Sequence, residues 1–383
     1  MMNSRERFKA TLQGDKPGMP FLWESGFDDG AVERWHREGL PKGTNPFEYF
    51  GLDRVAQVNI STNLIPSLRE CIIGDESGYL ILEDEAGGIR RMLKKQSLKP
   101  STRISTTAMI RWPLRDRPSW EILKSRLNPY SPERMAVFEP FLNGEKPAPD
   151  GRWSQISGFW GSYAKEDGYP IVLVFTGPTY WLIIHAGFEN AAVMLYDDPE
   201  LIHEIYEYYT WYLDVQLRYI LSRRVPDAVF IGEEICYKGG LFMSPNMYLK
   251  YACPGLSRIT DICRGAGIKL IFGESGGHIS PVIPLWREIG INGLIPLDVS
   301  GGTDPVEIRM RYDDLLLIGG IDRTALENGR EEICREINRT ARVFYSEGRA
   351  IPCGDCHFAI SDKVTFDNMC FYVDGLRELW QTI

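Results

Sequence analysis

From about residue 165 onward, short apolar runs alternate with longer amphipathic segments, and this alternation most restricts what the chain can fold into. The longer segments have helical patterns, for example "AAVMLYDDPELIHEIYEYYTWYLDVQLRYILSRR" and "REEICREINRTARVFYSEG". Short β-branched runs that alternate with amphipathic helices are typical of a parallel sheet with right-handed crossover connections. The runs that we expect to form strands are 171–176, 227–232, 268–273, 291–297, 315–319 and 349–353.

The number of strands decides between two kinds of parallel sheet. "MPFLWES" near the start adds a seventh expected strand, and "DRVAQVNI" adds a weaker eighth. Eight parallel strands suit a closed (β/α)8 TIM barrel. The competing open, doubly wound sheet has less support, because no G-x-G-x-x-G follows a first strand. We therefore predict an α/β protein with a (β/α)8 barrel.

Residues 71–160 interrupt the alternation. The stretch "YLILEDEAGGIRRMLKK" predicts a hairpin whose turn is "EAGG", and the residues after it are loop-rich. We interpret this region as an insertion over one mouth of the barrel. The predicted organisation is a single barrel domain over residues 1–383 with a hairpin and loop insertion at about 71–160.

Charge and composition exclude several classes of function. The 43 basic and 52 acidic residues give a net charge of -9, which argues against a nucleic-acid binder. Apolar runs such as "IVLVF" are far too short to span a bilayer, and no targeting signal is visible. The eight cysteines are scattered along the chain, as expected for reduced thiols in a cytoplasmic protein.

Acidic residues follow most of the expected strands. Barrel enzymes place their chemistry at the carboxyl ends of the strands, so these side chains should meet at one mouth. Carboxylates crowded together repel one another unless a proton, a base or a cation compensates them, and a bound metal is the economical explanation. Each also has a structural alternative: Asp298 and Asp322 could cap helices, and adjacent Glu233 and Glu234 should point to opposite faces. The acidic strand-end residues are Glu24, Glu233, Glu234, Glu274, Asp298, Asp322 and Asp355.

The segment "CGDCH" after the last strand is a more specific signal. Cys353, Cys356 and His357 place two thiols and an imidazole within five residues, and these are the usual donors to zinc. No second cysteine pair lies nearby, so we do not expect a complete structural zinc site. The sequence predicts that a metal is bound somewhere in this cluster.

Several motifs together resemble one superfamily, that of uroporphyrinogen decarboxylase and the related corrinoid-dependent methyltransferases. They are "NSRERFKATLQGDKPGMP", "VFTGPTYWLIIHAGFENAAVMLYDDPELI", "GEEICYKGGLFMSP", "LIFGESGGHISPVIPLWREIGINGLIPLD", "LLLIGGIDR" and "GRAIPCGDCHFAISDKVTFDNMCFYVDGLREL". The resemblance runs almost end to end and implies the (β/α)8 barrel. The arginine-rich segment of the true decarboxylase corresponds here to "WESGFDDGAVERWH", which is acidic and aromatic and a poor host for a porphyrin polyanion.

The methyltransferase branch of this superfamily holds zinc with a His-x-Cys pair after the fifth strand and a cysteine near the last strand. In this sequence Glu274 stands at the histidine position and Gly276 at the cysteine position. The resemblance therefore implies a rebuilt zinc site. Its expected ligands are Glu234, Glu274 and one of Cys353, Cys356 and His357, and the expected catalytic residues are Glu234, Glu274 and His357.

A site with two carboxylates is harder than a thiolate site and prefers oxygen partners. Such a zinc ion would polarise an ether oxygen, and the corrinoid branch includes enzymes that demethylate methoxylated aromatics. The resemblance thus implies a corrinoid-dependent O-demethylating methyltransferase, with an aryl methyl ether as substrate and cobalamin carried by a separate corrinoid protein. The aromatic residues expected to bind the substrate ring are Trp23, Phe27, Tyr180, Trp181 and Tyr237.

Two alternatives remain open from the sequence. The first is a metal-independent decarboxylase or lyase of the uroporphyrinogen decarboxylase type, in which the carboxylates serve as acid and base. The second is a barrel that binds a ligand without catalysis, because Glu274 and Gly276 occupy the positions of the usual zinc ligands.

Overall fold

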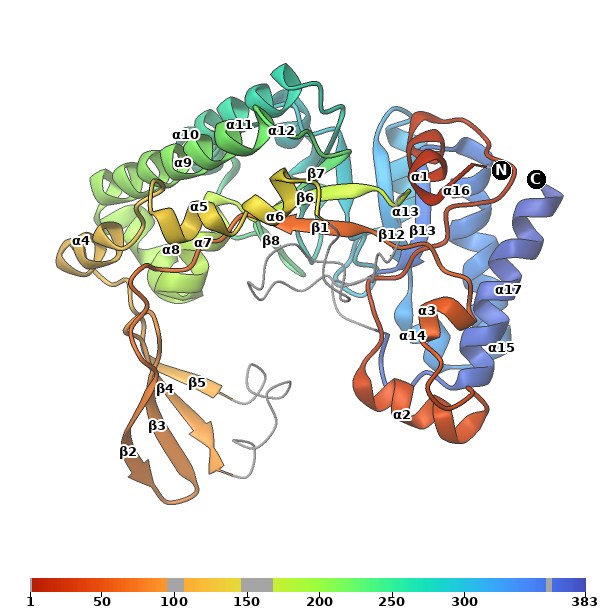
Figure 1. Ribbon diagram of the computed structural model, residues 1–383, viewed down its shortest axis with the longest axis horizontal. Helices are drawn as coiled ribbons and strands as arrows, with labels where there is room; N and C mark the ends of the chain where they lie inside the picture. The colour runs from red at the N-terminus through yellow and green to blue at the C-terminus, as the bar shows by residue number, and fades with distance from the viewer. Residues whose placement is uncertain (1, 95–106, 146–167, 356–359) are drawn as a thin grey trace.

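The centre of the molecule is a curled parallel sheet (Figure 1). The computed structural model describes residues 2–94, 107–145, 168–355 and 360–383. Within these residues the sheet has the order β1-β6-β7-β10-β11-β12-β13, and each strand is parallel to its neighbours. The six strands expected beyond residue 165 and the weaker one at 53–60 are all present. Their bounds are β1 Ala56–Asn59, β6 Ile171–Thr176, β7 Ala228–Gly232, β10 Leu270–Glu274, β11 Gly293–Ile295, β12 Leu316–Ile321 and β13 Ala350–Gly354.

The strands are apolar on both faces because both faces are covered. In β6, Val172 belongs to the cluster inside the barrel, whereas Leu173 and Phe175 belong to the cluster between the sheet and the helices. Side chains fill the barrel interior, as in other (β/α)8 proteins. The interior cluster consists of Phe8, Leu12, Phe21, Trp23, Val55, Val172, Ala228, Phe230, Leu270, Phe272, Ile295, Leu316, Ile318, Ile351 and Cys353.

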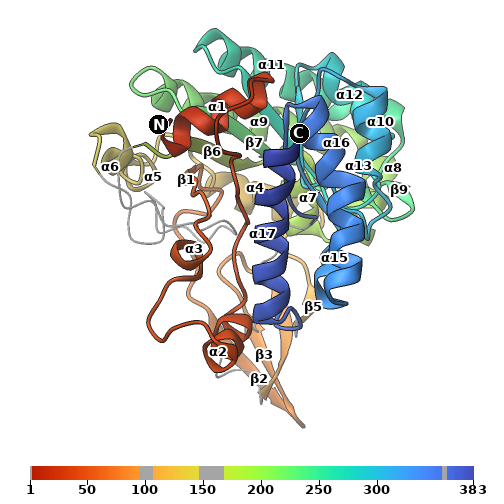
Figure 2. The same ribbon diagram turned by 90° about the vertical axis from the view of Figure 1, so that its right-hand side faces the viewer.

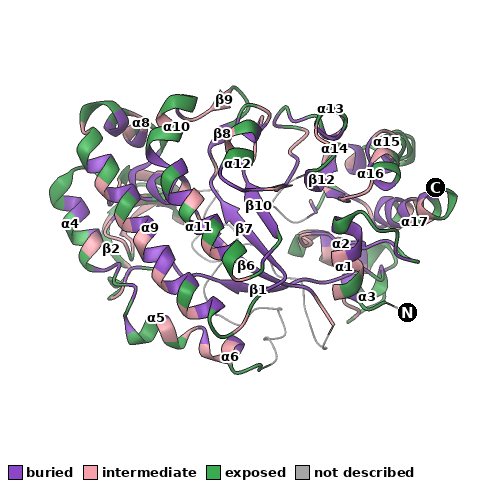
Figure 3. Cartoon of the chain, turned by 90° about the horizontal axis from the view of Figure 1, so that it is seen from above, coloured by how far each residue is buried: buried purple, intermediate pink, exposed green. Residues whose placement is uncertain are grey.

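Helices surround the sheet with buried inner faces and exposed outer faces (Figure 3). The long pattern after β6 forms two helices, α8 and α9, because Asp198 caps the second through the Leu201 N–H and Pro199 occupies its first position. Figure 2 shows α15 and α17 packed side by side. The helices of the barrel are α1 Ser4–Gln13, α2 Asp29–Glu38, α3 Pro46–Tyr49, α7 Pro178–Ala186, α8 Phe188–Asp197, α9 Pro199–Leu221, α10 Pro245–Tyr251, α11 Cys253–Gly265, α12 Ile283–Glu288, α13 Pro305–Arg311, α14 Arg323–Glu327, α15 Arg330–Glu336, the π-helical turn η3 Ile337–Ala341, α16 Arg342–Glu347 and α17 Phe366–Thr382.

The expected strand at "MPFLWES" is wrong as a strand, although its residues do occupy the gap between β1 and β13. Phe21 and Trp23 point into the barrel and Leu22 packs outside, as strand residues would. The backbone of Leu22 accepts from the Asp53 N–H at 2.6 Å, but its own N–H donates to the Asp53 carboxylate at 3.0 Å. On the other side, the Gly354 N–H donates to Glu24 Oε2 at 3.0 Å. Carboxylates therefore act as acceptors of backbone N–H groups where the barrel closes, beside the backbone bond between Asp53 and Leu22.

The predicted hairpin is confirmed within a four-stranded antiparallel sheet that projects from the barrel (Figure 1). Its turn is closed by hydrogen bonds between Asp84 and Gly88 and between Gly87 and Asp84. The helices that follow the sheet pack on the main core through Trp120 and Phe138. The division into one domain with an insertion at about 71–160 stays a prediction, and residues 146–160 lie outside the described residues. The elements of this region are β2 Cys71–Glu76, β3 Tyr79–Glu83, β4 Ile89–Leu93, β5 Thr107–Arg111, α4 Arg117–Ser125, α5 Pro132–Ala136 and α6 Glu139–Leu142.

No helix in the described chain combines the length and the apolar character that crossing a membrane requires.

Candidate functional site

Two glutamates meet at the carboxyl ends of neighbouring strands. Glu274 is the last residue of β10, and Glu234 lies two residues beyond the end of β7. The Glu274 carbonyl accepts from the N–H groups of both Glu233 (2.9 Å) and Glu234 (3.3 Å). The Glu274 side chain is only 8% exposed, and its Oε2 lies against Gly232, where an added Cβ would approach it to 3.7 Å. These contacts hold both carboxylates at one mouth of the barrel.

Tyr180 stands beside this pair. It lies in the first turn of α7, and its Cδ1 would come within 3.8 Å of a Cβ on Gly232, which is the same point that Glu274 Oε2 approaches. Burial, together with the negative charges of Glu234 and Glu274, raises the pKa of Tyr180 to about 12. The phenol therefore stays protonated near neutral pH and can donate a hydrogen bond. Tyr180 is the predicted ring-binding residue that the structure brings to the two glutamates.

Glu234 adopts a backbone conformation that is uncommon for a side chain of its size. Its φ is 41°, in the left-handed region, where a residue other than glycine costs of order 1–3 kcal/mol. Its Oε2 accepts from the Gly276 N–H at 3.2 Å. A Cβ on Gly276 would lie 3.6 Å from Asp298 Oδ2 and 3.8 Å from Glu234 Oε2, so these two carboxylates flank the loop after β10. Local strain of this kind is concentrated at functional sites.

Glu233 points to different surroundings from Glu234, as expected for adjacent residues on an extended chain. Its carboxyl group is completely buried among the helices, where it accepts from the Thr179 N–H at 3.3 Å and the Tyr248 hydroxyl at 3.1 Å. Burial raises the pKa of Glu233 to about 8. Glu233 thus fixes the start of α7 to β7 and does not face the mouth of the barrel.

A Glu233→Gln variant should gain stability relative to the native protein as the pH rises. The folded-state pKa of about 8 lies above the ordinary value of 4.5, so the folded protein retains a proton that the unfolded chain has already lost. The stability of the native protein therefore falls as the pH rises from about 4.5 to about 8, and glutamine removes this dependence. Urea unfolding at pH 5 and pH 8.5 measures the effect. An equal difference between variant and native protein at both pH values would contradict it.

The remaining strand ends carry a second group of acidic residues. Asp298 accepts from the N–H groups of Gly277 and Gly301, both at 2.8 Å, and from the Ser300 hydroxyl at 2.9 Å. Asp322 caps α14 through the Thr324 N–H, which confirms the capping alternative for that residue.

Asp355 lies at the end of β13 and binds two neighbouring loops. Its carboxylate accepts from the N–H groups of Val299 at 3.1 Å and Arg323 at 3.3 Å. Burial raises the pKa of Asp355 to about 6. Glu24 likewise has a structural role, because it accepts from the Tyr372 hydroxyl at 2.9 Å as well as from Gly354. Burial raises the pKa of Glu24 to about 7.

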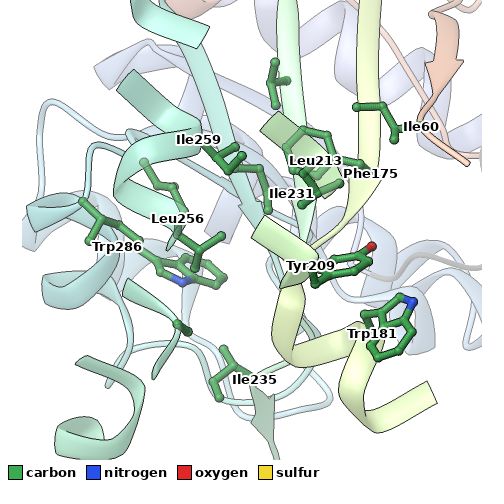
Figure 4. Close-up of a cluster of buried hydrophobic side chains, with 14 of the residues drawn as sticks. Ile60, Phe175, Trp181, Tyr209, Leu213, Ile231, Ile235, Leu256, Ile259 and Trp286 are labelled. Carbon is green, nitrogen blue, oxygen red and sulfur yellow. The ribbon is translucent and has the colours of Figure 1, made fainter. Parts of the chain in front are cut away.

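The other aromatic residues predicted to bind the substrate are dispersed. Trp23 is part of the filled barrel interior, and Phe27 lies in a separate aromatic cluster, 5.2 Å from Trp35 between ring centroids. Trp181 has no exposed surface and packs among helices, next to Tyr209 (Figure 4). Because Trp181 is fully buried, its ring cannot contact a substrate at the mouth. Adjacent residues of a helix point in directions about 100° apart, so Tyr180 faces the glutamates while Trp181 points into the core.

Tyr237 is 49% exposed and lies next to the loop after β10. Gly277 in that loop has φ +77°, and a Cβ there would come within 2.6 Å of the Tyr237 backbone. Only glycine allows this close approach. Tyr237 is therefore available at the edge of the mouth.

The predicted metal donors are placed only in part. Cys353 is buried near the end of β13 and belongs to the interior cluster, whereas Cys356 and His357 lie outside the described residues. Over residues 2–94, 107–145, 168–355 and 360–383, no three His, Cys, Asp or Glu side chains gather closely enough to hold a metal ion. The carboxylates of Glu234 and Glu274 can supply two of the three ligands in the predicted zinc site. The described residues therefore fit that site in part.

Sequence reasoning missed one charged residue of the mouth. Arg323 follows Asp322 at the end of β12, and its Nη2 donates to the Ser300 hydroxyl at 3.4 Å. The signal was present in "GGIDR", where a basic residue comes directly after a strand-end aspartate.

The fold and the site together define the class, a (β/α)8-type barrel with carboxylates at the carboxyl ends of its strands. Residues 164–351 match the family model described as "Uroporphyrinogen decarboxylase (URO-D)". This match covers most of the repeating strands and helices of the barrel and bears out the resemblance to the uroporphyrinogen decarboxylase superfamily that the motifs predicted.

A solved structure has a similar fold. A "methyltransferase from Methanosarcina mazei" has a TM-score of 0.58 and 13% sequence identity, over 99% of this chain and 100% of that chain. A "Putative Vitamin-B12 Independent Methionine Synthase" from Listeria monocytogenes also shares 13% identity, over 56% of this chain and 65% of that one. Its TM-score of 0.33 is too low to bear on the fold. A search of curated proteins found no match in sequence.

Proposed function

We propose that the protein is a methyltransferase that removes the methyl group from a small methylated compound, with an aryl methyl ether as the substrate. The acceptor is the cobalt of a corrinoid carried by a separate partner protein. The observation that carries this proposal is the group formed by Glu234, Glu274 and protonated Tyr180 at the mouth of a uroporphyrinogen decarboxylase-type barrel. The fold neighbour from Methanosarcina mazei, itself described as a methyltransferase, supports the choice of reaction.

The proposed metal is zinc, held by Glu234, Glu274 and one of Cys353, Cys356 and His357. When bound, zinc would supply Lewis-acid stabilisation of the charge that develops on the ether oxygen. The two glutamates have oxygen donors, and this donor set matches an oxygen-containing substrate better than a thiol. The acidic mouth also makes the decarboxylase alternative less favourable, since a porphyrin polyanion would be repelled there.

The protein's own residues have separate roles in this proposal. The raised pKa of Tyr180 keeps its hydroxyl protonated, so it can donate a hydrogen bond to the departing oxygen. The rings of Tyr180 and Tyr237 offer flat apolar surfaces to an aromatic substrate. The interior cluster closes the barrel beneath the site, so that substrate and partner must approach from the mouth.

A methyl-transfer assay tests the reaction. Zinc-loaded protein is mixed with a methoxybenzoate and cob(I)alamin, and the expected result is loss of cob(I)alamin absorbance together with release of the hydroxybenzoate. No demethylation by intact zinc-loaded protein would leave only a binding function. Metal-edge absorption tests the ligands separately: mainly oxygen and nitrogen neighbours with at most one sulfur are expected, and three sulfurs would exclude the glutamate site.

A further inference from the structure

Arg323 places a positive charge at the mouth of the barrel. It begins α14, and its backbone N–H donates to the Asp355 carboxylate at 3.3 Å. Its guanidinium reaches the Ser300 hydroxyl, 3.4 Å away, in the loop after β11. The backbone contact fixes residue 323 beside the end of β13, and the guanidinium contact directs the half-buried side chain toward the loop after β11.

A continuous set of contacts connects Arg323 with the glutamate pair. Ser300, which accepts from Arg323, donates to Asp298 Oδ1 at 2.9 Å. The other oxygen of Asp298 and Glu234 Oε2 both lie close to Gly276, 3.6 and 3.8 Å from the point that a Cβ on this glycine would occupy. The guanidinium and the glutamates therefore belong to the same mouth, and Ser300, Asp298 and Gly276 connect them.

The charge of Arg323 differs from that of the other strand-end positions. We compared the two residues that follow each strand of the parallel sheet, as far as the structure describes them. Arg323 is basic, whereas Glu233, Glu234, Asp322 and Asp355 are acidic and no other is charged. An anionic group that enters this mouth would be repelled by the carboxylates at most positions and attracted at Arg323. The planar guanidinium fork suits a carboxylate, which it can bind through two parallel hydrogen bonds.

We propose that Arg323 binds a carboxylate group of the substrate, so that the methyl donor is an anionic aryl ether of the methoxybenzoate class. This inference rests on the proposed function and specifies its substrate. One guanidinium matches one carboxylate, with the ring extending from Arg323 toward Tyr180 and the methoxy group toward Glu234 and Glu274. Arg323 then determines specificity by distinguishing an acid from a neutral compound of the same shape.

Equilibrium binding of 4-methoxybenzoate and 4-methoxybenzamide provides the test, because the two compounds differ in charge and hardly in shape. Calorimetry on the protein without corrinoid makes the result independent of methyl transfer. The native protein should bind the benzoate more tightly. In an Arg323→Gln variant the benzoate affinity should fall by about 10- to 100-fold, which is the loss of a charge-assisted pair, and the benzamide affinity should stay unchanged.

Two further variants control the test. Arg330→Gln also removes one positive charge, from an exposed ion pair between Arg330 on α15 and Asp367 on α17. This variant should bind the benzoate and the benzamide as tightly as the native protein does. Arg323→Lys keeps the charge and loses the fork, so its benzoate affinity should be intermediate. Circular dichroism of each variant verifies that it is folded.

The possible outcomes separate this inference from the proposed reaction. Equal weakening of both compounds by Arg323→Gln would mean that the arginine only compensates Asp298 and Asp355, and it would overturn the inference. Equal affinity of the native protein for both compounds, or no binding of either, would also overturn it. Selective loss of benzoate binding without any demethylation in the assay would instead support the Arg323 assignment and count against the methyltransferase.

Discussion

Glu274→Gln is expected to lower methyl-transfer activity by at least about 100-fold, since changing even an indirect partner of a metal site typically costs 10- to 100-fold. Glutamine keeps the size of the side chain but removes the negative charge beside Tyr180. The backbone contribution of residue 274 should persist, because its carbonyl still accepts from the N–H groups of residues 233 and 234. The loss should therefore appear in activity and zinc content, with the free energy of unfolding little changed.

Activity, bound zinc and urea unfolding are measured for Glu274→Gln alongside Glu234→Gln. The matched control is Glu331→Gln on α15, where the side chain is 92% exposed and outside the mouth. Both mouth variants should lose activity, and the control should retain it. Full activity in Glu274→Gln would remove the carboxylate pair from the mechanism.

Trp181→Ala is expected to lower the free energy of unfolding by about 3–5 kcal/mol, the usual range for removing a large buried aromatic side chain. The indole stacks between His185, at 4.1 Å between ring centroids, and Tyr209, at 5.1 Å. It also meets Trp120 edge to face at 6.0 Å, so its loss leaves a cavity where α4, α7 and α9 pack together. Urea denaturation measures this effect.

Two companion variants separate packing from substrate binding. Trp181→Phe retains much of the ring and should cost less than Trp181→Ala. Tyr237→Ala removes a ring that is 49% exposed, so it should change stability by less than about 0.5 kcal/mol while weakening affinity for an aromatic substrate. If Trp181→Ala instead unfolds like the native protein and binds substrate weakly, the sequence interpretation of Trp181 is right.

Much of the fold could be predicted because the strands of the parallel sheet are buried on both faces. Such strands must be continuous apolar runs, and these runs are visible in the sequence. The runs at 171–176 and 268–273 correspond closely to β6 and β10 for this reason. Residues 20–24 show where the pattern is insufficient. Phe21, Leu22 and Trp23 alternate in and out as a strand would, but strand assignment requires a regular pattern of backbone pairs, and here the carboxylates of Asp53 and Glu24 accept some of the backbone N–H groups.

The candidate site could be predicted in outline, because parallel strands bring their carboxyl ends together and the sequence shows which of them end in acids. Glu234 and Glu274 follow from that rule. The choice among aromatic residues could not be made, since composition does not show which side of the barrel wall a ring occupies. Tyr180 and Trp181 are neighbours on one helix, and a rotation of about 100° separates a position at the mouth from one in the core.

The carboxylate contacts beside residues 20–24 have a consequence for how the barrel moves. The assigned strand pairs of the sheet end at β1 and β13, and between them the carboxylates of Asp53 and Glu24 accept from backbone N–H groups, although a regular ladder does not use such acceptors. Transient openings should therefore begin along this line, and amide hydrogens there should exchange with solvent sooner than those between β7 and β10. Local opening between β1 and β13 can widen the mouth of the barrel on that side, while the strands across the barrel, which include β10 with Glu274, keep their positions.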